Sequence, residues 1–110
     1  MAETYKVLAQ VSSTAATEID LYTVPTDKYV VVSGLTVANR SSDDATIRIS
    51  IAVGGVSTSD EQYVVYDEIM YGNSGSVYCK GITLGADDVV RVYASSDYIS
   101  FGLFGVEVDA

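Results

Sequence analysis

The stretch from Tyr29 to Val53 constrains the fold most, because it holds two strand-like runs joined by a polar turn. The first run, from Tyr29 to Asn39, is almost continuously apolar, so residues 30–32 are expected to be covered on both faces or to lie where the strand changes role. In the second run apolar residues alternate with polar ones, as in a half-buried strand. The apolar residues of that second run are Ile47, Ile49, Ile51 and Val53. We expect the two runs to form a hairpin at the centre of the fold.

The rest of the chain repeats this pattern of short apolar runs separated by turn residues. Pro25 closes one run because proline has no amide hydrogen for a sheet, and Gly72-Asn73-Ser74-Gly75 marks a turn. Turn signals at intervals of about 8–12 residues are typical of a sandwich or small barrel. We expect about eight strands, over residues 5–11, 19–24, 29–39, 45–53, 62–71, 76–83, 89–94 and 99–108.

The predicted fold is therefore all-β: a single-domain, antiparallel, jelly-roll-like β-sandwich that covers residues 1–110. In the last run, the apolar character changes face between Gly102 and Gly105. This change predicts a bulge there, or a strand covered on both sides.

Charge excludes two classes of partner. Fifteen Asp and Glu against six Lys and Arg give a net charge of -9, which would repel nucleic acid and anionic membrane surfaces. The N-terminus lacks the pattern of a signal peptide, and no apolar stretch approaches the length of a membrane span. We therefore expect a protein made in the cytoplasm, with neither nucleic acid nor a membrane as partner.

The single cysteine, Cys79, cannot form an intramolecular disulfide and is expected to be buried.

Histidine is absent, which excludes Ser-His-Asp and Cys-His nucleophile systems and zinc sites that contain histidine. Only carboxylate pairs remain as candidates for chemistry, and all lie in or beside expected turns, where Asp side chains bond their own backbone. We expect no catalytic residue, no metal and no cofactor; the alternatives are calcium at the Asp43-Asp44 or Asp87-Asp88 turn and acid/base glycoside chemistry by a carboxylate pair. The four pairs are Asp43-Asp44, Asp60-Glu61, Asp67-Glu68 and Asp87-Asp88.

Nine tyrosines are many for 110 residues. Tyrosine packs well on sheets and also serves recognition surfaces that are dry at one end and wet at the other. Tyr63 and Tyr66 lie in one run and are expected to face opposite ways. Ordinary sheet residues are one interpretation, and a stacking platform for sugars is the other. Five tyrosines lie on runs expected to be close in space: Tyr63, Tyr66, Tyr71, Tyr78 and Tyr93.

Several tracts resemble small accessory virion proteins of tailed bacteriophages. They are Tyr5-Lys6-Val7-Leu8, Leu21-Tyr22-Thr23-Val24-Pro25 with the Val-rich run up to Asn39-Arg40-Ser41, residues 82–94, and Phe101-Gly102-Leu103-Phe104-Gly105. The resemblance implies a β-sandwich that assembles on the virion, either as a head decoration or cement protein or in the tail, fibre or baseplate. It also implies virion partners such as the major capsid protein or tail proteins, and release from the host cell by lysis.

A protein of a repetitive lattice needs exposed turns and self-complementary faces, and most homo-oligomers close by rotational symmetry. We expect a homotrimer without enzymatic activity; a receptor- or glycan-binding fibre module is the alternative. The expected interaction residues are those of an exposed loop and three tyrosines: Arg40, Asp43, Asp44, Tyr63, Tyr66 and Tyr71.

Overall fold

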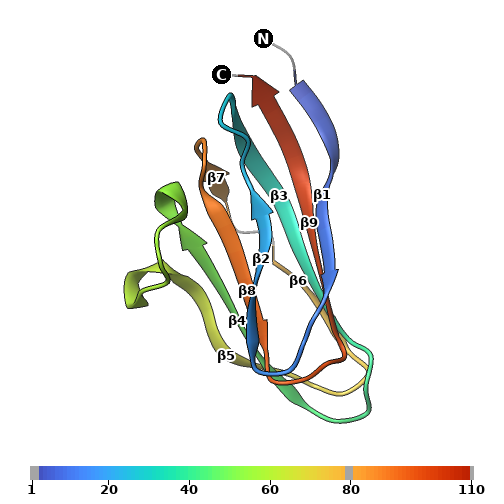
Figure 1. Ribbon diagram of the computed structural model, residues 1–110. Helices are drawn as coiled ribbons and strands as arrows, with labels where there is room; N and C mark the ends of the chain where they lie inside the picture. The colour runs from blue at the N-terminus through green and yellow to red at the C-terminus, as the bar shows by residue number, and fades with distance from the viewer. Residues whose placement is uncertain (1–2, 79–80, 110) are drawn as a thin grey trace.

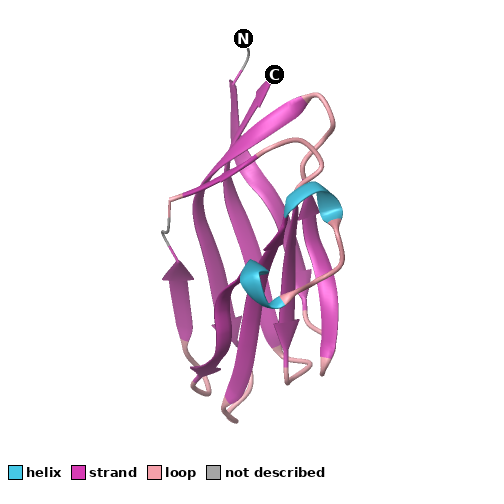
Figure 2. Ribbon diagram, turned by 90° about the vertical axis from the view of Figure 1, so that its left-hand side faces the viewer, coloured by secondary structure: helices cyan, strands magenta, loops and turns pink. Residues whose placement is uncertain are grey.

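The computed structural model describes residues 3–78 and 81–109 as strands, turns and two short 3-10 helices (Figure 1). The 3-10 helices are η1 (Val53–Gly55) and η2 (Asp60–Gln62), both in the long connection between two strands (Figure 2). The strands are β1 (Glu3–Ser12), β2 (Thr17–Thr23), β3 (Lys28–Asn39), β4 (Ala45–Ala52), β5 (Tyr63–Met70), β6 (Gly75–Tyr78), β7 (Ile82–Leu84), β8 (Val89–Ala94) and β9 (Ile99–Asp109).

Two antiparallel sheets pack face to face (Figure 1). Sheet A has the order β1-β9-β3, with β6 and β7 both paired to the free side of β3, and sheet B has the order β2-β8-β4-β5. Neighbouring strands come from opposite ends of the chain, since β1 pairs with β9 and β2 with β8. This is the wrapped strand order of a jelly roll. The predicted all-β sandwich is confirmed.

The strand expected over residues 76–83 is two shorter strands that lie one after the other along β3 (Figure 2). β6 pairs with residues 35–38 of β3, and β7 pairs with residues 30–32. The expected burial of Cys79 lies outside the described residues.

The expected hairpin between residues 29 and 53 is wrong. β3 pairs only within sheet A, whereas β4 pairs with β5 and β8 in sheet B. The connection over residues 40–44 is long enough to cross the roughly 10 Å between packed sheets, so it carries the chain to the opposite sheet. Each strand is an interior strand of its sheet, so this stretch still lies at the centre of the fold.

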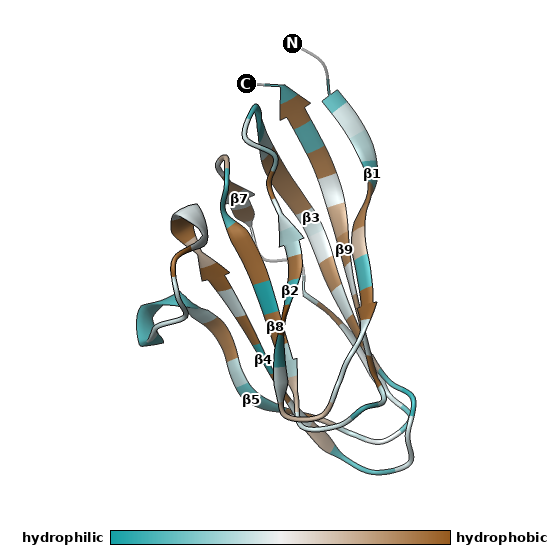
Figure 3. Ribbon diagram, in the orientation of Figure 1, coloured by the Kyte–Doolittle hydropathy of each residue, from teal (hydrophilic) through white to brown (hydrophobic). Residues whose placement is uncertain are grey.

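The core lies between the sheets, where the apolar stripes of the interior strands meet (Figure 3). Val30 and Val32 are buried but Val31 is 43% exposed, so this run alternates and is not covered on both faces. Val53 is exposed because it leaves β4 for η1. The most fully buried large side chains are Ile47, Ile49, Leu84, Ile99, Leu103, Val24, Val30, Val37, Val90 and Val92.

The bulge expected between Gly102 and Gly105 is wrong for β9 itself, and two bulges lie instead in the neighbouring strands β1 and β3. Leu8 in β1 and Ser33 in β3 are extra residues opposite an uninterrupted β9. Glycine is required at position 105, since a Cβ atom there would collide with the carbonyl oxygen of Val31.

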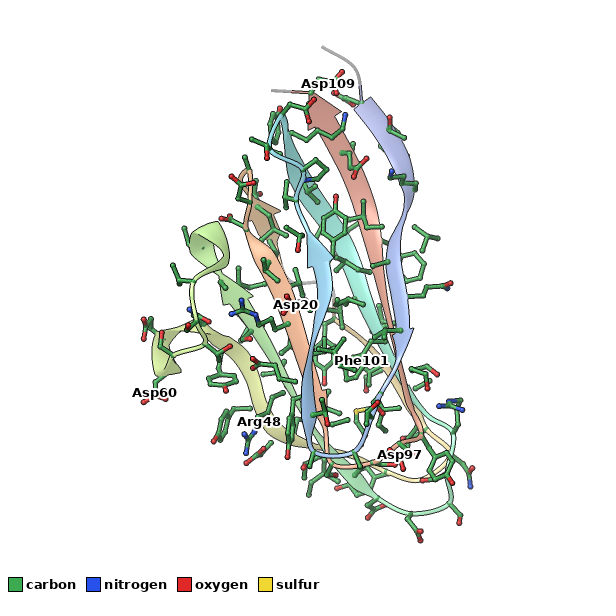
Figure 4. The ribbon with its side chains drawn as sticks, in the orientation of Figure 1. Asp20, Arg48, Asp60, Asp97, Phe101 and Asp109 are labelled. Atoms are coloured by element: carbon green, nitrogen blue, oxygen red, sulfur yellow. The ribbon has the colours of Figure 1, made fainter. Side chains whose placement is uncertain are left out.

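The two ends of the sandwich differ. One end gathers the loops over residues 13–16, 40–44, 71–74 and 95–98, and we call it the four-loop end (bottom of Figure 1). Asp97 marks this end and Asp109 marks the other in Figure 4. Both described ends of the chain, Glu3 and Asp109, therefore lie away from the four loops (Figure 1).

Candidate interaction surfaces

The loop after β3 is exposed at Arg40, Asp43 and Asp44, as expected, and a buried side chain organises it. Asn39, 3% exposed, donates from Nδ2 to the carbonyl oxygens of Asp43 (2.8 Å) and Met70 (3.0 Å). Asp44 Oδ1 accepts a hydrogen bond from the Gly72 amide (3.0 Å). These bonds tie the loop to the adjacent loop over residues 71–74 and fix its backbone.

Arg40 links this loop to two others at the four-loop end. Its Nη2 donates to Ser12 Oγ (2.7 Å) and to the Asp97 carbonyl oxygen (3.3 Å), and its guanidinium lies 5.9 Å from the centre of the Tyr98 ring. Tyr71, which follows β5, is 63% exposed. The structure thus places four of the six predicted interaction residues, Arg40, Asp43, Asp44 and Tyr71, at one end of the molecule.

Tyr63 and Tyr66 lie on the same face of sheet B, so the expectation that they face opposite ways is wrong. Their ring centres are 4.8 Å apart in an edge-to-face arrangement. Tyr63 pairs with Ser50 whereas Val65 pairs with Ile49, which leaves Val64 as an extra residue in β5. Such a bulge shifts the alternation of side chains by one residue.

Arg48 lies between two tyrosine rings on the outer face of sheet B (Figure 4). Its guanidinium carbon is 4.4 Å from the centre of the Tyr66 ring and 4.7 Å from that of Tyr93, within cation–π range. Its Nε and Nη2 donate to the two carboxylate oxygens of Asp67 (2.6 and 3.2 Å). These bonds raise the pKa of Arg48 and lower the pKa of Asp67. The sequence did not point to Arg48 as a site residue, because its place beside the tyrosines depends on the bulges of β5.

Two tyrosines connect the sheets at their open edges. Beside β1 and β2, the Tyr22 hydroxyl donates to Glu107 Oε2 (2.6 Å) while Lys6 Nζ lies 2.8 Å from Oε1. The bonds from Lys6 and Tyr22 lower the pKa of Glu107 although the residue is only 8% exposed. Burial, with the bond to Glu107, raises the pKa of Tyr22. At the opposite edge the Tyr78 hydroxyl donates to the Glu68 carboxylate, and burial with this bond raises the pKa of Tyr78.

The outer face of sheet A is a further surface that the sequence did not reveal. Residues that pair across the strands form four rows on this face, each running across the sheet. In order along the strands, the rows are Tyr5, Val106, Val31 and Thr83; Val7, Phe104 and Gly34; Gln10, Gly102, Thr36 and Val77; and Ser12, Ser100, Ala38 and Gly75. The first two rows form an apolar ridge, and the last two hold mostly small residues around a shallow hollow of about 410 Å³. No residue of the four rows carries a charge.

The carboxylates of the Asp87-Asp88 turn bond the protein itself, as turn aspartates do. Asp88 accepts from the Gly54 and Gly85 amides (both 2.8 Å), and Asp87 Oδ1 accepts from Thr26 Oγ1 (3.0 Å). Across residues 3–78 and 81–109, no three or more Cys, Asp or Glu side chains gather as potential metal ligands. Over the same residues no helix has the length and apolarity needed to cross a membrane.

Comparison with solved structures relates the fold to virus particles. The chain is similar to a chain in the structure of infectious bursal disease virus Gx strain, with a TM-score of 0.60 and 13% identity over 99% of this chain and 33% of that one. It is also similar to a chain of the T13 particle of the same virus, with a TM-score of 0.59 and 13% identity over 97% of this chain and 31% of that one. These likenesses establish the fold.

The chain spans about a third of the length of the virus chains that it matches. A pentameric capsid protein from metagenomic phage sequences aligns with 96% of this chain and 64% of its own at 13% identity, with a TM-score of 0.44 that is too low to establish a common fold. No family model matches the sequence. No curated protein matches it either.

Proposed function

We propose that this chain is a non-enzymatic structural protein of a bacteriophage virion, which assembles as an oligomer on the head or in the tail or baseplate. The observation that carries the proposal is the jelly roll, which extends over 99% of the chain in its likeness to a virus-particle chain. The sequence resemblance to tailed-phage accessory proteins supplies the bacteriophage assignment. Its partners are further copies of itself and a major capsid or tail protein.

Mass spectrometry of purified phage particles that encode this chain tests the proposal. Peptides of the chain should be recovered at a fixed ratio to the major capsid protein after density-gradient purification. Immunogold electron microscopy of the same particles then separates a head position from a tail position. Particles that lack the chain altogether would contradict a virion role.

The four-loop end is the surface we assign to contact with another virion protein. Its loops hold one another in place through Arg40 and Asp44, and Arg40, Asp43 and Tyr71 are exposed there. Reversing one charge, Asp43→Lys, leaves the bonds of Asn39 and Asp44 intact and should reduce incorporation into particles. Incorporation at the wild-type level would exclude the Asp43 side chain from the contact.

A receptor- or glycan-binding module is the second candidate, and the cluster around Arg48 favours it. Tyr66 is 58% exposed beside Arg48 and Tyr63, an arrangement of aromatic surface and donors that suits a sugar ring. A glycan array probed with the protein and with its Tyr66→Ala variant tests this function. Binding that is lost in the variant supports it, and an array without binding removes it.

A further inference from the structure

We propose that the connection between β4 and β5 is a strap that opens and closes over the outer face of sheet B, with the Arg91 side chain as its latch. The strap consists of residues 53–62, with η1 at its start and η2 at its end (Figure 2). Opening uncovers a polar row beside the cluster around Arg48, so the strap controls how much of this face another molecule can reach. The inference concerns the free chain and does not depend on the proposed function.

The strap is longer than its two ends require. β4 and β5 are antiparallel neighbours, and such strands are usually joined by about two to five residues, whereas the strap runs over residues 53–62. The extra length folds back across the sheet, since Thr58 Oγ1 donates to Glu18 Oε1 (2.8 Å) on β2, at the opposite edge. Ser50 follows the core residue Ile49 and so faces outwards, yet it is only 2% exposed because η2 packs on β4.

One side chain holds the strap to the sheet. Arg91 lies between two core residues of β8 and therefore points outwards. Its Nη1 donates to the Val56 carbonyl oxygen (2.6 Å) and to Thr58 Oγ1 (3.2 Å), and its Nη2 donates to the Gly55 carbonyl oxygen (3.2 Å). Its Nε donates to Asp20 Oδ1 (2.9 Å), which fixes the guanidinium on the sheet. Three bonds between sheet and strap thus converge on one group.

Burial of apolar surface adds little to the closed strap. Its two valines, Val53 and Val56, are 72% and 57% exposed. Gln62 is 8% exposed, and its Nε2 donates to the Ser57 carbonyl oxygen (3.0 Å), but its Oε1 accepts no hydrogen bond within the described part of the chain. A buried acceptor without a partner destabilises the closed state, and opening gives it access to water. A segment held in this way belongs to the least stable part of a fold.

The ends of the strap allow it to move as a unit. Gly54 and Gly55 have φ values of 67° and 73°, in the region that glycine adopts without steric cost. At the other end, Val64 is an extra residue in β5 directly after the strap. No residue of the strap belongs to a described strand. The pairing of sheet B therefore stays intact when the strap opens.

Opening adds a second row to the surface around Arg48. Tyr63, Ser50 and Arg91 pair across β5, β4 and β8, next to the row of Tyr66, Arg48 and Tyr93. In the closed state the strap uses the Nη donors of Arg91. In the open state these donors become available to acceptors of another molecule.

Thiol labelling under the strap measures the opening. Ser50→Cys places a thiol beneath the strap, and Val92→Cys places one in the core on the other face of β8; both carry Cys79→Ser, which removes the native cysteine. Labelling in the core requires global unfolding, whereas labelling under the strap requires only local opening. We expect labelling at position 50 to be at least about 100-fold faster and nearly independent of low urea concentrations, because local opening exposes little surface. Equal rates at the two positions would overturn the proposal.

The latch is tested through the labelling ratio, which is the rate at position 50 divided by the rate at position 92. Arg91→Lys keeps a positive charge beside Asp20 but cannot bond three strap oxygens in the geometry of a guanidinium, so it should raise the ratio at least about tenfold. Arg48→Lys is the matched control, because Arg48 bonds Asp67 and contacts two tyrosine rings outside the strap. It should leave the ratio unchanged.

The unsatisfied acceptor predicts a change in the opposite direction. Gln62→Met removes the buried oxygen at a similar side-chain volume, and Ser57 is exposed, so its carbonyl oxygen can bond water instead. The labelling ratio should fall about fivefold or more. A ratio that stays the same or rises would show that Gln62 holds the strap closed, and would contradict a strap poised to open.

Two further outcomes would overturn the proposal: a labelling ratio that Arg91→Lys leaves unchanged, and a ratio that Arg48→Lys raises as much as Arg91→Lys does. Circular dichroism melting of each variant establishes that it is folded before its labelling is interpreted. All of these measurements use the free chain. A chain found in virions with equal labelling at positions 50 and 92 would contradict the strap and leave the proposed function supported.

Discussion

Glu107 lies between the two sheets with Lys6 on one carboxylate oxygen and Tyr22 on the other. A buried carboxylate is costly to remove from water unless both of its oxygens are satisfied. Here β1 supplies the cation and β2 the hydroxyl, so one residue of β9 holds three strands from two sheets together. The Tyr78–Glu68 bond joins the sheets in a similar way at the opposite edge.

Replacement of Glu107 by Gln keeps an oxygen for the Tyr22 hydroxyl and removes the ion pair with Lys6. We expect a loss of about 1–2 kcal/mol of unfolding free energy at neutral pH. Folding lowers the pKa of Glu107, so the carboxylate stabilises the wild type above its unfolded pKa of about 4.3. This contribution disappears as the pH falls through the folded pKa. Urea unfolding of both proteins should show a difference that shrinks below about pH 4; a difference independent of pH would contradict this role.

Tyr22 and Tyr78 should ionise later than ordinary tyrosines, because burial and a carboxylate partner raise the pKa of each. Their contribution to stability is complete below the unfolded pKa of about 10 and declines as the pH rises through and beyond that value. An alkaline absorbance titration should therefore show a group of tyrosines that ionises only as the chain unfolds. Tyr22→Phe and Tyr78→Phe should each reduce that group by one tyrosine. An unchanged titration curve in both variants would exclude them from it.

At the scale of single elements, β5 shows why the site could be predicted only in part. The alternation of apolar residues located the strands to within a few residues, and the exposure of the loop at Asp43 followed from its turn chemistry. The bulge at Val64 and the positive φ of Asp67 have no comparable signal in the sequence, because a bulge is defined by the partner strand. Tyr63, Tyr66 and Arg48 therefore came together unexpectedly.

Gly105→Ala should destabilise the fold strongly at the element scale. The new methyl group would collide with the backbone of β3 at Val31 and Val32, and two paired interior strands can separate only by disrupting the sheet. We expect a loss of more than about 2 kcal/mol, in the range of a core overpacking change. Gly85→Ala is the control, since the nearest atom to its Cβ would be Asp88 Oδ2 at 3.7 Å. Equal melting temperatures for the two variants would contradict the close approach.

Asn39→Ala should loosen the loops over residues 40–44 and 71–74 together. The change deprives the carbonyl oxygens of Asp43 and Met70 of their shared donor, at a cost of about 1–3 kcal/mol for buried unpaired groups. Hydrogen–deuterium exchange should accelerate in both loops and remain slow in β8. Faster exchange confined to residues 40–44 would show that the two loops are not coupled.

At the scale of the whole molecule, the order of the strands in the two sheets could not be predicted from the sequence. The turn at residues 40–44 has the composition of a hairpin turn, yet it crosses between sheets, because β3 and β4 each bury an apolar face against the opposite sheet. Which strands pair depends on contacts between distant segments such as β1 and β9. Sequence patterns report local periodicity, so they identified the sandwich and left its topology open.

The acidic balance of the whole chain should make its stability depend on salt. Net charge of -9 produces repulsion in the compact state that added salt screens. We expect the melting temperature to rise by about 2–5 °C between low and physiological ionic strength, equivalent to roughly 0.5–1 kcal/mol. Asp43→Lys with Asp60→Lys reduces the net charge by four units at exposed positions and should weaken this dependence. The same salt response in the double variant would contradict the repulsion.

The position of the chain ends has a practical consequence. Glu3 and Asp109 lie together at one end of the sandwich, opposite the four loops (Figure 1). A fluorescent protein or peptide cargo joined genetically near either end would thus extend away from Arg40, Asp43 and Tyr71. Such fusions can carry a label or a cargo while the loop surface of the chain stays uncovered.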